Sequence, residues 1–310
     1  MMTSSWILSD DYAGLQAQAL GLAEAAGLAP DLRVLRPGPV WKHIPARLWP
    51  APLRAVPREI LAPPLPELLI GCGGMAAVIV AAMKRHGPRA VQVQNPRFDP
   101  GRFDLVIVNR HDEITGPNVI VTRTALHRVT AARLAAEATL WRPHFADLPR
   151  PRVAVLIGGS NGRFRLDEAA GHGLAAQLVE LARQGAGIMV TPSRRTDPAV
   201  LRILAAALAP VGGFVWDKAG LNPYFGMLAL ADTIIPTMDS VSMVSEAAAT
   251  TVPVLFAELP GRSRRIRLFL EGLVGDGRIR PFAGRLESWP ITPINDTEAA
   301  AAEMRHRLHF

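Results

Sequence analysis

Short apolar runs alternate with helix-length segments from one end of the chain to the other. This alternation is typical of parallel sheets whose strands are joined by crossover helices. In the first half it predicts strands near 6–8, 32–35, 67–70, 90–94, 105–108 and 119–121, and helices near 14–26, 75–85 and 131–139. The proline-rich stretch 37–66 interrupts the pattern, and its prolines exclude a long regular helix there.

The proline-rich segment 142–151 has the composition of a linker, and the alternation begins again at Val153. The second half predicts strands near 153–157, 188–191, 213–215, 233–235 and 254–257, and helices near 167–184, 198–208, 224–231, 240–250 and 263–273. A long irregular stretch precedes a last helix at 296–308. We therefore expect an α/β protein with two parallel-sheet domains, residues 1–148 and 149–295, and a C-terminal helix within 296–310 that packs back on the first domain.

Length and composition agree with two domains. The chain has 310 residues, of which 49% are hydrophobic, and single cores usually stop growing below this size. One cysteine, Cys72, excludes an intramolecular disulfide framework and a cysteine-rich zinc site, which fits a cytoplasmic protein. We expect no secretory signal, because the N-terminus lacks a basic region followed by a long apolar core. The most apolar stretch, 68–83, is broken by glycines and is too short to cross a bilayer.

The net charge is +7, from 34 basic and 27 acidic residues. Such a charge attracts anionic partners, namely nucleotides, phospholipid surfaces or nucleic acid. Only 6% of the residues are aromatic, the arginines are spread along the chain, and no nucleic-acid module is recognisable. Nucleic acid is therefore the least supported of the three partners, and we expect none.

Small hydroxyl residues follow the apolar run 231–236, where a helix should begin. Asp239 or Ser240 can cap this helix, and the free N–H groups of a helix amino end favour phosphate. Glu246 lies about two turns into the helix and can reach a ligand hydroxyl. The alternative is an ordinary capped helix in an α/β domain.

Three other loops of the second half follow predicted strands, where open parallel sheets bind ligands. Residues 158–163, Gly-Gly-Ser-Asn-Gly-Arg, can form an anion-binding nest or a tight turn, but they are neither a Walker loop nor a complete Gly-x-Gly-x-x-Gly motif. In the next loop Ser193 and Arg194 can hold a diphosphate. The alternative is that both arginines of this loop are solvated, and for Arg195 this is what we expect. Trp216 and Tyr224 can form a wall for a base or sugar, or simply pack. Together these loops and the helix start predict a pocket for a nucleotide or a nucleotide diphosphate.

The first half offers a different set of polar residues. Asp10 and Asp11 follow the first strand, and either can act as a general base or cap a helix. His111 and Asp112 follow the strand near 105–108, where the imidazole can serve as a base or form a structural pair. No second histidine stands at metal-binding spacing, so no metal site is expected. The loop 71–74, Gly-Cys-Gly-Gly, also leads into a helix.

Several catalytic motifs are absent from the sequence. It has no Gly-x-Ser-x-Gly elbow, no Gly-x-x-x-x-Gly-Lys loop and no His-Glu-x-x-His motif. Their absence argues against an α/β-hydrolase, a P-loop enzyme and a zinc protease. Group transfer from a nucleotide-linked donor stays open.

Five segments resemble the elongated-mitochondria family of plant mitochondrial-fission proteins and their bacterial relatives, and the resemblance spans nearly the whole chain. They are residues 6–14 with Gln18, 94–96, 109–112, 155–161 and 239–247. The most specific is Asp-Ser-Val-Ser-Met-Val-Ser-Glu at 239–246. The chain departs from the family at Asp11 and Thr251, where glycines are usual; the first departure leaves the choice of catalytic base open.

This resemblance implies a fold like that of the GT-B glycosyltransferases, with two Rossmann-like domains facing across a cleft. It implies that the second domain holds the donor, with Glu246 on the ribose, and that Asp10, Asp11 and His111 face the acceptor. Residues expected in the donor site are Gly158, Gly159, Ser160, Asn161, Ser193, Arg194, Trp216, Asp239, Ser240, Ser242, Met243 and Glu246.

The leading interpretation is a glycosyltransferase that needs no metal or other cofactor and uses a nucleotide-diphosphate sugar. One alternative is a non-catalytic adaptor or membrane scaffold, located in the cytoplasm or at the inner face of a membrane. Residues 39–49 mix aromatic and basic side chains, which suit a lipid interface but are more simply explained by a packed loop. A second basic cluster lies at 262–267. An anionic membrane surface or a lipid-linked acceptor would both explain these features. A nucleotide-sugar epimerase is a third interpretation.

Overall fold

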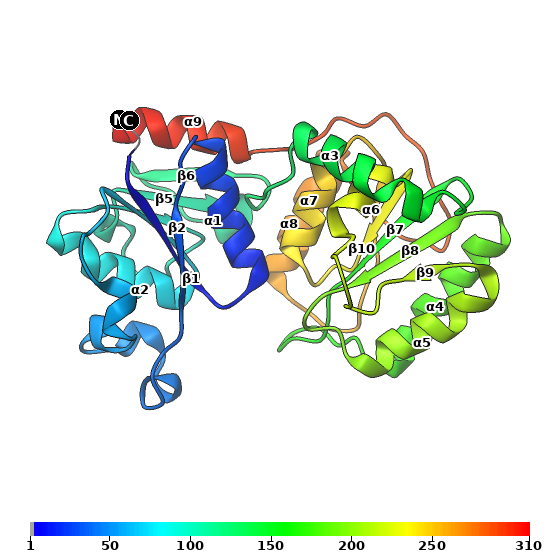
Figure 1. Ribbon diagram of the computed structural model, residues 1–310, viewed down its shortest axis with the longest axis horizontal. Helices are drawn as coiled ribbons and strands as arrows, with labels where there is room; N and C mark the ends of the chain where they lie inside the picture. Colours follow the sequence, from blue (N-terminus) through cyan, green and yellow to red (C-terminus); the bar gives the residue numbers. More distant parts are fainter. Residues whose placement is uncertain (1–2) are drawn as a thin grey trace. The chain divides into compact units, whose positions relative to one another are not determined.

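The computed structural model describes residues 3–310, so the first two residues of the N-terminal segment lie outside it. The chain divides into two compact units. The first contains residues up to Arg128 together with Asn295–Phe310, and the second contains Val129–Ile294. Each unit holds one six-stranded sheet in which the paired strands are parallel (Figure 1). The predicted alternation of strands and helices is confirmed in both.

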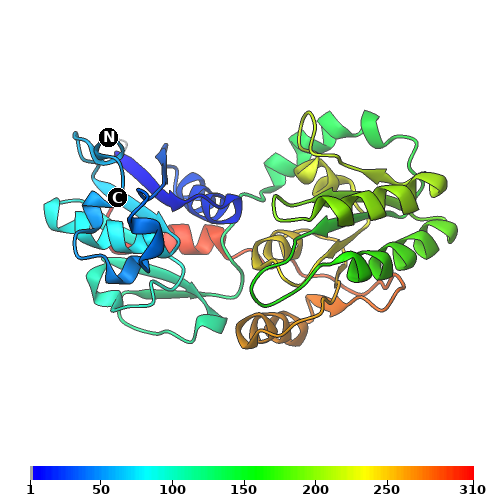
Figure 2. The ribbon, with the colours of Figure 1, turned by 90° about the horizontal axis from the view of Figure 1, so that it is seen from below.

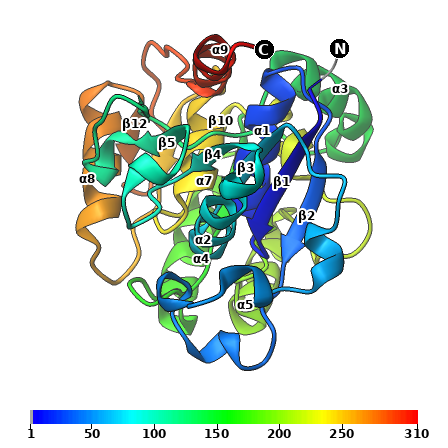
Figure 3. The ribbon, with the colours of Figure 1, turned by 90° about the vertical axis from the view of Figure 1, so that its left-hand side faces the viewer.

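The first sheet has the strand order β2-β1-β3-β4-β5-β6. Its strands are β1 (Ser5–Asp10), β2 (Asp31–Leu35), β3 (Leu68–Cys72), β4 (Arg89–Val93), β5 (Leu105–Asn109) and β6 (Val119–Thr122). The helices of this unit are α1 (Ala13–Ala25), α2 (Gly74–Met83) and α9 (Thr297–Leu308). Figure 3 shows β1 between β2 and β3.

Successive side chains of β1 supply two separate cores. Trp6 and Leu8 pack with α2, whereas Ile7 packs with α1 and α9 on the opposite face. Because side chains alternate across a strand, a run that is apolar at every position is covered on both faces.

The proline-rich stretch forms four short 3₁₀ turns, Trp41–His43, Ala46–Leu48, Pro52–Arg54 and Arg58–Leu61, in place of a long helix.

The C-terminal helix α9 belongs to the first unit, where it packs against α1. Asp296, just before the helix, accepts hydrogen bonds from the backbone N–H of Thr124 (3.1 Å) and from the Arg123 guanidinium (2.9 Å). At the other end Arg305 donates to the carbonyl of Ala26 (3.1 Å). These bonds fix both ends of α9 to the unit that contains the start of the chain.

The second sheet has the strand order β12-β11-β10-β7-β8-β9. Its strands are β7 (Arg152–Ile157), β8 (Gly187–Pro192), β9 (Phe214–Val215), β10 (Thr233–Pro236), β11 (Val254–Phe256) and β12 (Ile279–Pro281). Its helices are α3 (Ala131–Trp141), α4 (Glu168–Arg183), α5 (Pro198–Leu208), α6 (Tyr224–Leu230), α7 (Val241–Ala248) and α8 (Arg264–Gly275). In Figure 2, α4 and α5 are the two green helices that run side by side.

The second unit is also layered on both faces of its sheet. Val153, Val155 and Ile157 of β7 pack with α4 and α5, and Ala154 and Leu156 pack with α3, α6, α7 and α8. The short edge strand β12 was not predicted, because two of its three residues are exposed and it shows no apolar run.

Helix α3 lies in the second unit, although the sequence placed the boundary at residue 149. It packs against α6. A Cβ atom at Gly226 of α6 would lie 2.3 Å from the ring of Trp141, and Arg133 lies over the ring of Phe225 at 5.1 Å. The proline-rich segment 142–151 therefore lies inside this unit.

The strand order of the second sheet reverses between β7 and β10. At such a point the loops leaving the two strands diverge to opposite faces and leave a crevice at the carboxyl edge of the sheet. The loops after β7 and β10 are the segments that contain Gly158–Asn161 and Asp239–Glu246. The topology thus brings together residues that lie far apart in the sequence.

Candidate functional site

One carboxylate, that of Asp239, joins the loops at the carboxyl edge of the second sheet. Its side chain is fully buried. Oδ2 accepts the N–H of Gly159 from the loop after β7 (3.1 Å) and Nη2 of Arg195 from the loop after β8 (2.9 Å). Oδ1 accepts the hydroxyl of Thr237, at the end of β10 (2.7 Å). Three loops are therefore held at fixed spacing by one buried charge.

The two glycines after β7 make this junction possible. A Cβ atom at Gly158 would lie 2.3 Å from the carboxylate oxygens of Asp239, and one at Gly159 would lie 2.3 Å from the carbonyl oxygen of Arg195. Real side chains do not tolerate such distances, so both positions require glycine. The sequence allowed either an anion-binding nest or a tight turn here; the N–H of Gly159 donates to Asp239, and contact of the two glycines with a ligand stays a prediction.

The rest of this loop is shaped by bonds within the segment. Ser160 Oγ accepts the N–H of Leu166 (2.9 Å). Asn161 Oδ1 accepts the N–H groups of Arg163 (2.9 Å) and Phe164 (3.0 Å). Ser160 and Asn161 are both exposed, so their predicted contact with a ligand stays a prediction.

The loop after β8 is tied to the same junction. Ser193 Oγ donates to the carbonyl of Gly158 (2.7 Å), and Thr196 Oγ1 donates to that of Ile157 (3.1 Å). Arg195 was expected to be solvated, and this was wrong: it forms the ion pair with Asp239 and donates to the carbonyl of Gly159 (3.1 Å). Arg194 is exposed on this loop.

Helix α7 begins directly after the junction. Ser240, rather than Asp239, is its cap: the Ser240 hydroxyl accepts the N–H of Met243 (3.4 Å). The first N–H groups of a helix have no partner within the helix and carry a partial positive charge. Ser242 and Met243 lie in this first turn and are half-buried.

Glu246 is buried on α7 and receives a hydrogen bond from the hydroxyl of Tyr224, at the start of α6. Burial raises the pKa of Glu246 from 4.5 to about 7, and the bond from Tyr224 lowers it by a smaller amount. Burial and the nearby carboxylate also raise the pKa of Tyr224. The sequence offered Tyr224 as a wall or a packing residue, and nothing in the local pattern indicated its bond to Glu246.

Trp216 follows the edge strand β9 and is half-buried. Its indole Nε1 donates to the carbonyl of Ala219 (2.8 Å), which fixes the ring against its own loop. Nζ of Lys218 lies 3.5 Å from the carbonyl oxygen of Thr196, so this loop reaches the loop after β8.

The predicted catalytic residues of the first unit have structural partners. Asp10 accepts the N–H groups of Ala76 (2.9 Å) and Met75 (3.3 Å), so it caps α2 from the end of β1. Burial raises the pKa of Asp10, and these backbone bonds offset part of the rise. Asp11 pairs with Arg36 at 3.2 Å on the surface. His111 is buried in a 3₁₀ turn, Arg110–Asp112.

Residues 3–310 contain neither a candidate metal site nor a helix that could span a membrane. The described residues contain no group of three or more His, Cys, Asp or Glu side chains that could hold a metal ion. Within the same range, every helix is too short or too polar to cross a membrane.

Replacing Asp239 tests the junction. In Asp239→Asn, Arg195 loses its ion-pair partner. The NH₂ group of the new amide also replaces an acceptor oxygen, and it faces groups that themselves donate hydrogen bonds. We expect the free energy of unfolding to fall by about 2–4 kcal/mol in urea titrations. Asp217→Asn, an exposed site, serves as the control and should change it by less than about 1 kcal/mol. Equal effects of the two variants would contradict the account.

The raised pKa of Glu246 makes stability depend on pH. Between pH 4.5 and about 7 the folded protein retains a proton that the unfolded chain has lost, so the free energy of unfolding falls as pH rises through this window. Glu246→Gln lacks this titration. The free energy of unfolding of Glu246→Gln minus that of wild type should therefore rise by about 3 kcal/mol between pH 4.5 and pH 8. Parallel stability curves for the two proteins would show that the carboxyl group titrates normally.

Solved structures share this fold at low sequence identity. UDP-GlcNAc 2-epimerase from Methanocaldococcus jannaschii matches with a TM-score of 0.58 at 12% identity, over 99% of this chain and 100% of that one. S. aureus MnaA, in a structure with UDP, matches with a TM-score of 0.55 at 11% identity, over 98% of this chain and 95% of that one. MurG of Acinetobacter baumannii matches with a TM-score of 0.50 at 15% identity, over 99% of this chain and 95% of that one. These likenesses confirm the predicted GT-B-like α/β fold.

Sequence comparisons identify closer relatives. Mitochondrial fission protein ELM1 of Arabidopsis thaliana is 31% identical over 273 residues, which are 78% of this chain and 64% of the plant protein. The chain thus spans less than two thirds of that relative. An uncharacterized protein of Rickettsia prowazekii is 26% identical over 98% of both chains. The family model described as mitochondrial fission ELM1 matches residues 13–308. The chain therefore belongs to the mitochondrial fission ELM1 family.

Proposed function

We propose that the second unit binds a nucleoside diphosphate sugar and that the protein transfers the sugar to an acceptor. The observation that carries this proposal is helix α7, whose amino end lies at the switch point of the sheet and which holds a buried carboxylate, Glu246. A positive helix end and a hydroxyl-binding carboxylate on one short helix match a phosphate and a ribose.

The diphosphate would lie at the amino end of α7. The N–H groups of the first turn and the hydroxyl of Ser242 can donate to its oxygens, and Arg194 is exposed on the neighbouring loop. These groups would stabilise the charge that develops on the diphosphate as the sugar leaves. No metal ion is required for this role.

The nucleoside would lie along the same edge of the sheet. Ser242 and Glu246 are four residues apart and so share one face of α7. Tyr224 donates to Oε2 of Glu246, and a ribose hydroxyl would donate to Oε1. Trp216, beside the loop after β8, would bound the base. UDP is the natural first probe, because MnaA was solved with UDP and other structural neighbours are UDP-GlcNAc epimerases.

Transfer would break the bond between the sugar C1 and the diphosphate oxygen and form a bond from C1 to an acceptor oxygen, whose proton passes to a base. Asp10, Asp11 and His111 stay the candidates for this base. Asp10 is engaged in capping α2 and Asp11 is paired with Arg36, which favours a second function, a nucleotide-binding adaptor without turnover. An epimerase would use the same pocket.

Isothermal titration with UDP tests the binding site. At pH 8, where most Glu246 is ionised, wild type should bind, and Glu246→Gln should bind about tenfold or more weakly, because the ribose hydroxyl then donates to a neutral amide instead of a carboxylate. Glu180→Gln, exposed on α4, is the matched control and should bind like wild type. Wild type that does not bind UDP, or a Glu246→Gln variant that binds equally well, would overturn the proposal.

The same proteins separate transfer from binding alone. Release of UDP from UDP-GlcNAc at subsaturating concentration, measured with cell extract as the source of acceptor and corrected for extract alone, should fall about tenfold or more in Glu246→Gln and be kept in Glu180→Gln. Binding of UDP without any release from UDP-sugars would favour the adaptor.

A further inference from the structure

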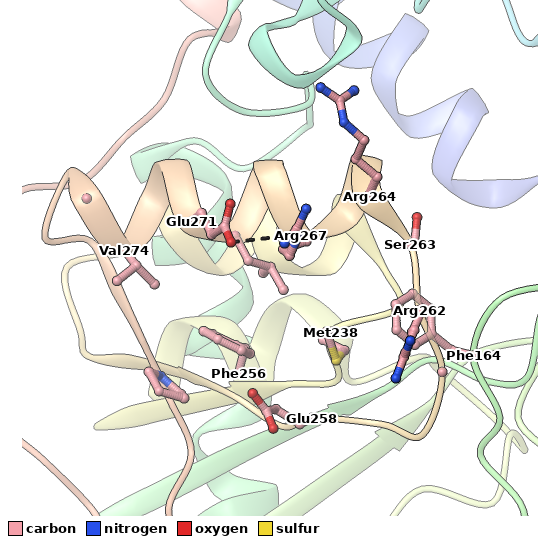
Figure 4. A pocket seen from close by; sticks show the side chains of 14 residues that line it. Phe164, Met238, Phe256, Glu258, Arg262, Ser263, Arg264, Arg267, Glu271 and Val274 are labelled. Atoms are coloured by element: carbon pink, nitrogen blue, oxygen red, sulfur yellow. Dashed lines mark ion pairs between the residues drawn. The ribbon is translucent and has the colours of Figure 1, made fainter.

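The second unit contains an open cavity of about 920 Å³ beside helix α8 (Figure 4). It extends along α8 from Ser263, the cap of the helix, to Gly275 at the other end. The volume is within the range of cavities that hold small molecules. None of the residues proposed for the nucleotide lines it, although Met238, next to Asp239, does, so it adjoins the proposed nucleotide site without sharing its residues.

The carboxyl-end half of this cavity is apolar except for Glu271. Leu270 and Val274 of α8 line it together with Phe256 and Pro281, the last residues of β11 and β12. In Figure 4, Phe256 lies below α8, and Val274 is placed toward the end of the helix. Val274 is 41% exposed. An apolar chain covering it would remove this surface from water.

The amino-end half is cationic. Arg262, Arg264 and Arg267 line the cavity around Ser263, whose hydroxyl receives a hydrogen bond from Arg163 (3.3 Å). The first N–H groups of α8 add partial positive charge at this end.

Glu258 and Glu271 are the acidic residues of the lining. Glu271 lies 3.8 Å from Arg267 in a pair whose side chains are 67% and 59% exposed, so the pair is weak and either partner can exchange it for a ligand. The cavity thus changes along one helix from a cationic end to an apolar end.

We propose that this cavity binds an amphipathic anion, one acyl or prenyl chain that carries a phosphate head. The head would lie at Ser263 beside Arg262, which Figure 4 shows on the cavity side of the helix start, where guanidinium and backbone N–H groups can both donate to it. The chain would follow Leu270 and Val274 toward Pro281. Such a molecule can come from a membrane or exist free in solution.

Isothermal titration with decyl phosphate, kept below its critical micelle concentration, tests the ligand class. Wild type should bind one equivalent. Decyl maltoside has the chain without the charge, and inorganic phosphate has the charge without the chain; each should bind at least about tenfold more weakly. Equal binding of decyl maltoside, or no binding of decyl phosphate, would overturn the proposal.

Two kinds of variant locate the site. The double variant Arg262→Ala/Arg267→Ala removes two charges of the head-binding end, and Val274→Asp places a carboxylate in the path of the chain. Each variant should bind decyl phosphate about tenfold more weakly than wild type does. Val274→Trp, which fills the space without charge, is the second test of the chain path. Arg202→Ala, exposed on α5, is the control. Far-ultraviolet circular dichroism and UDP titration check that every variant is folded.

Vesicle flotation distinguishes the two sources of the ligand. Binding to phosphatidylcholine vesicles only when they contain phosphatidic acid, and its loss in the Arg262→Ala/Arg267→Ala variant, would identify a membrane lipid. Binding of decyl phosphate without flotation would identify a free amphiphile. Both results support the site, whereas decyl phosphate binding that survives all three variants would refute it. UDP binding is scored separately, so failure of one site leaves the other testable.

Discussion

The buried carboxylate of Asp239 is the contact on which the carboxyl edge of the second sheet depends. A carboxylate taken out of water is stable only where donors replace its hydration, and here Gly159, Thr237 and Arg195 do so. Because Gly159 and Arg195 belong to the loops after β7 and β8, one charge sets the spacing of three loops. A site ordered in this way loses little conformational entropy when a ligand binds.

The same constraint orients α7. Its amino end follows Asp239 directly, and its carboxyl end is held by Arg278, a buried arginine that donates to the carbonyls of Ala248 (2.8 Å), Ala247 (3.0 Å) and Thr250 (2.8 Å). Burial lowers the pKa of Arg278 to about 10, so the guanidinium stays charged at neutral pH and complements the negative end of the helix. Both ends of α7 are therefore fixed, and with them the position of Glu246.

The sequence predicted the fold better than the site. Every strand but β12 was predicted, because apolar runs such as 153–157 mark strands covered on both faces. The site depends on pairs that no local pattern encodes: Arg195 and Asp239 are 44 residues apart, and Tyr224 and Glu246 are 22 apart. The sequence placed Gly158 and Gly159 directly after a strand, but no local pattern indicated that they make room for Asp239 and for the Arg195 backbone.

Hydrogen exchange measured by mass spectrometry, with and without UDP, is the most direct test of the central claim that these loops form a nucleotide site. Backbone amides of residues 158–161, 193–196 and 240–246 should exchange more slowly when UDP is bound. Exchange along α8, where the second cavity lies, should change little. Bound UDP that leaves those three segments unchanged, or that protects α8 instead, would contradict the claim.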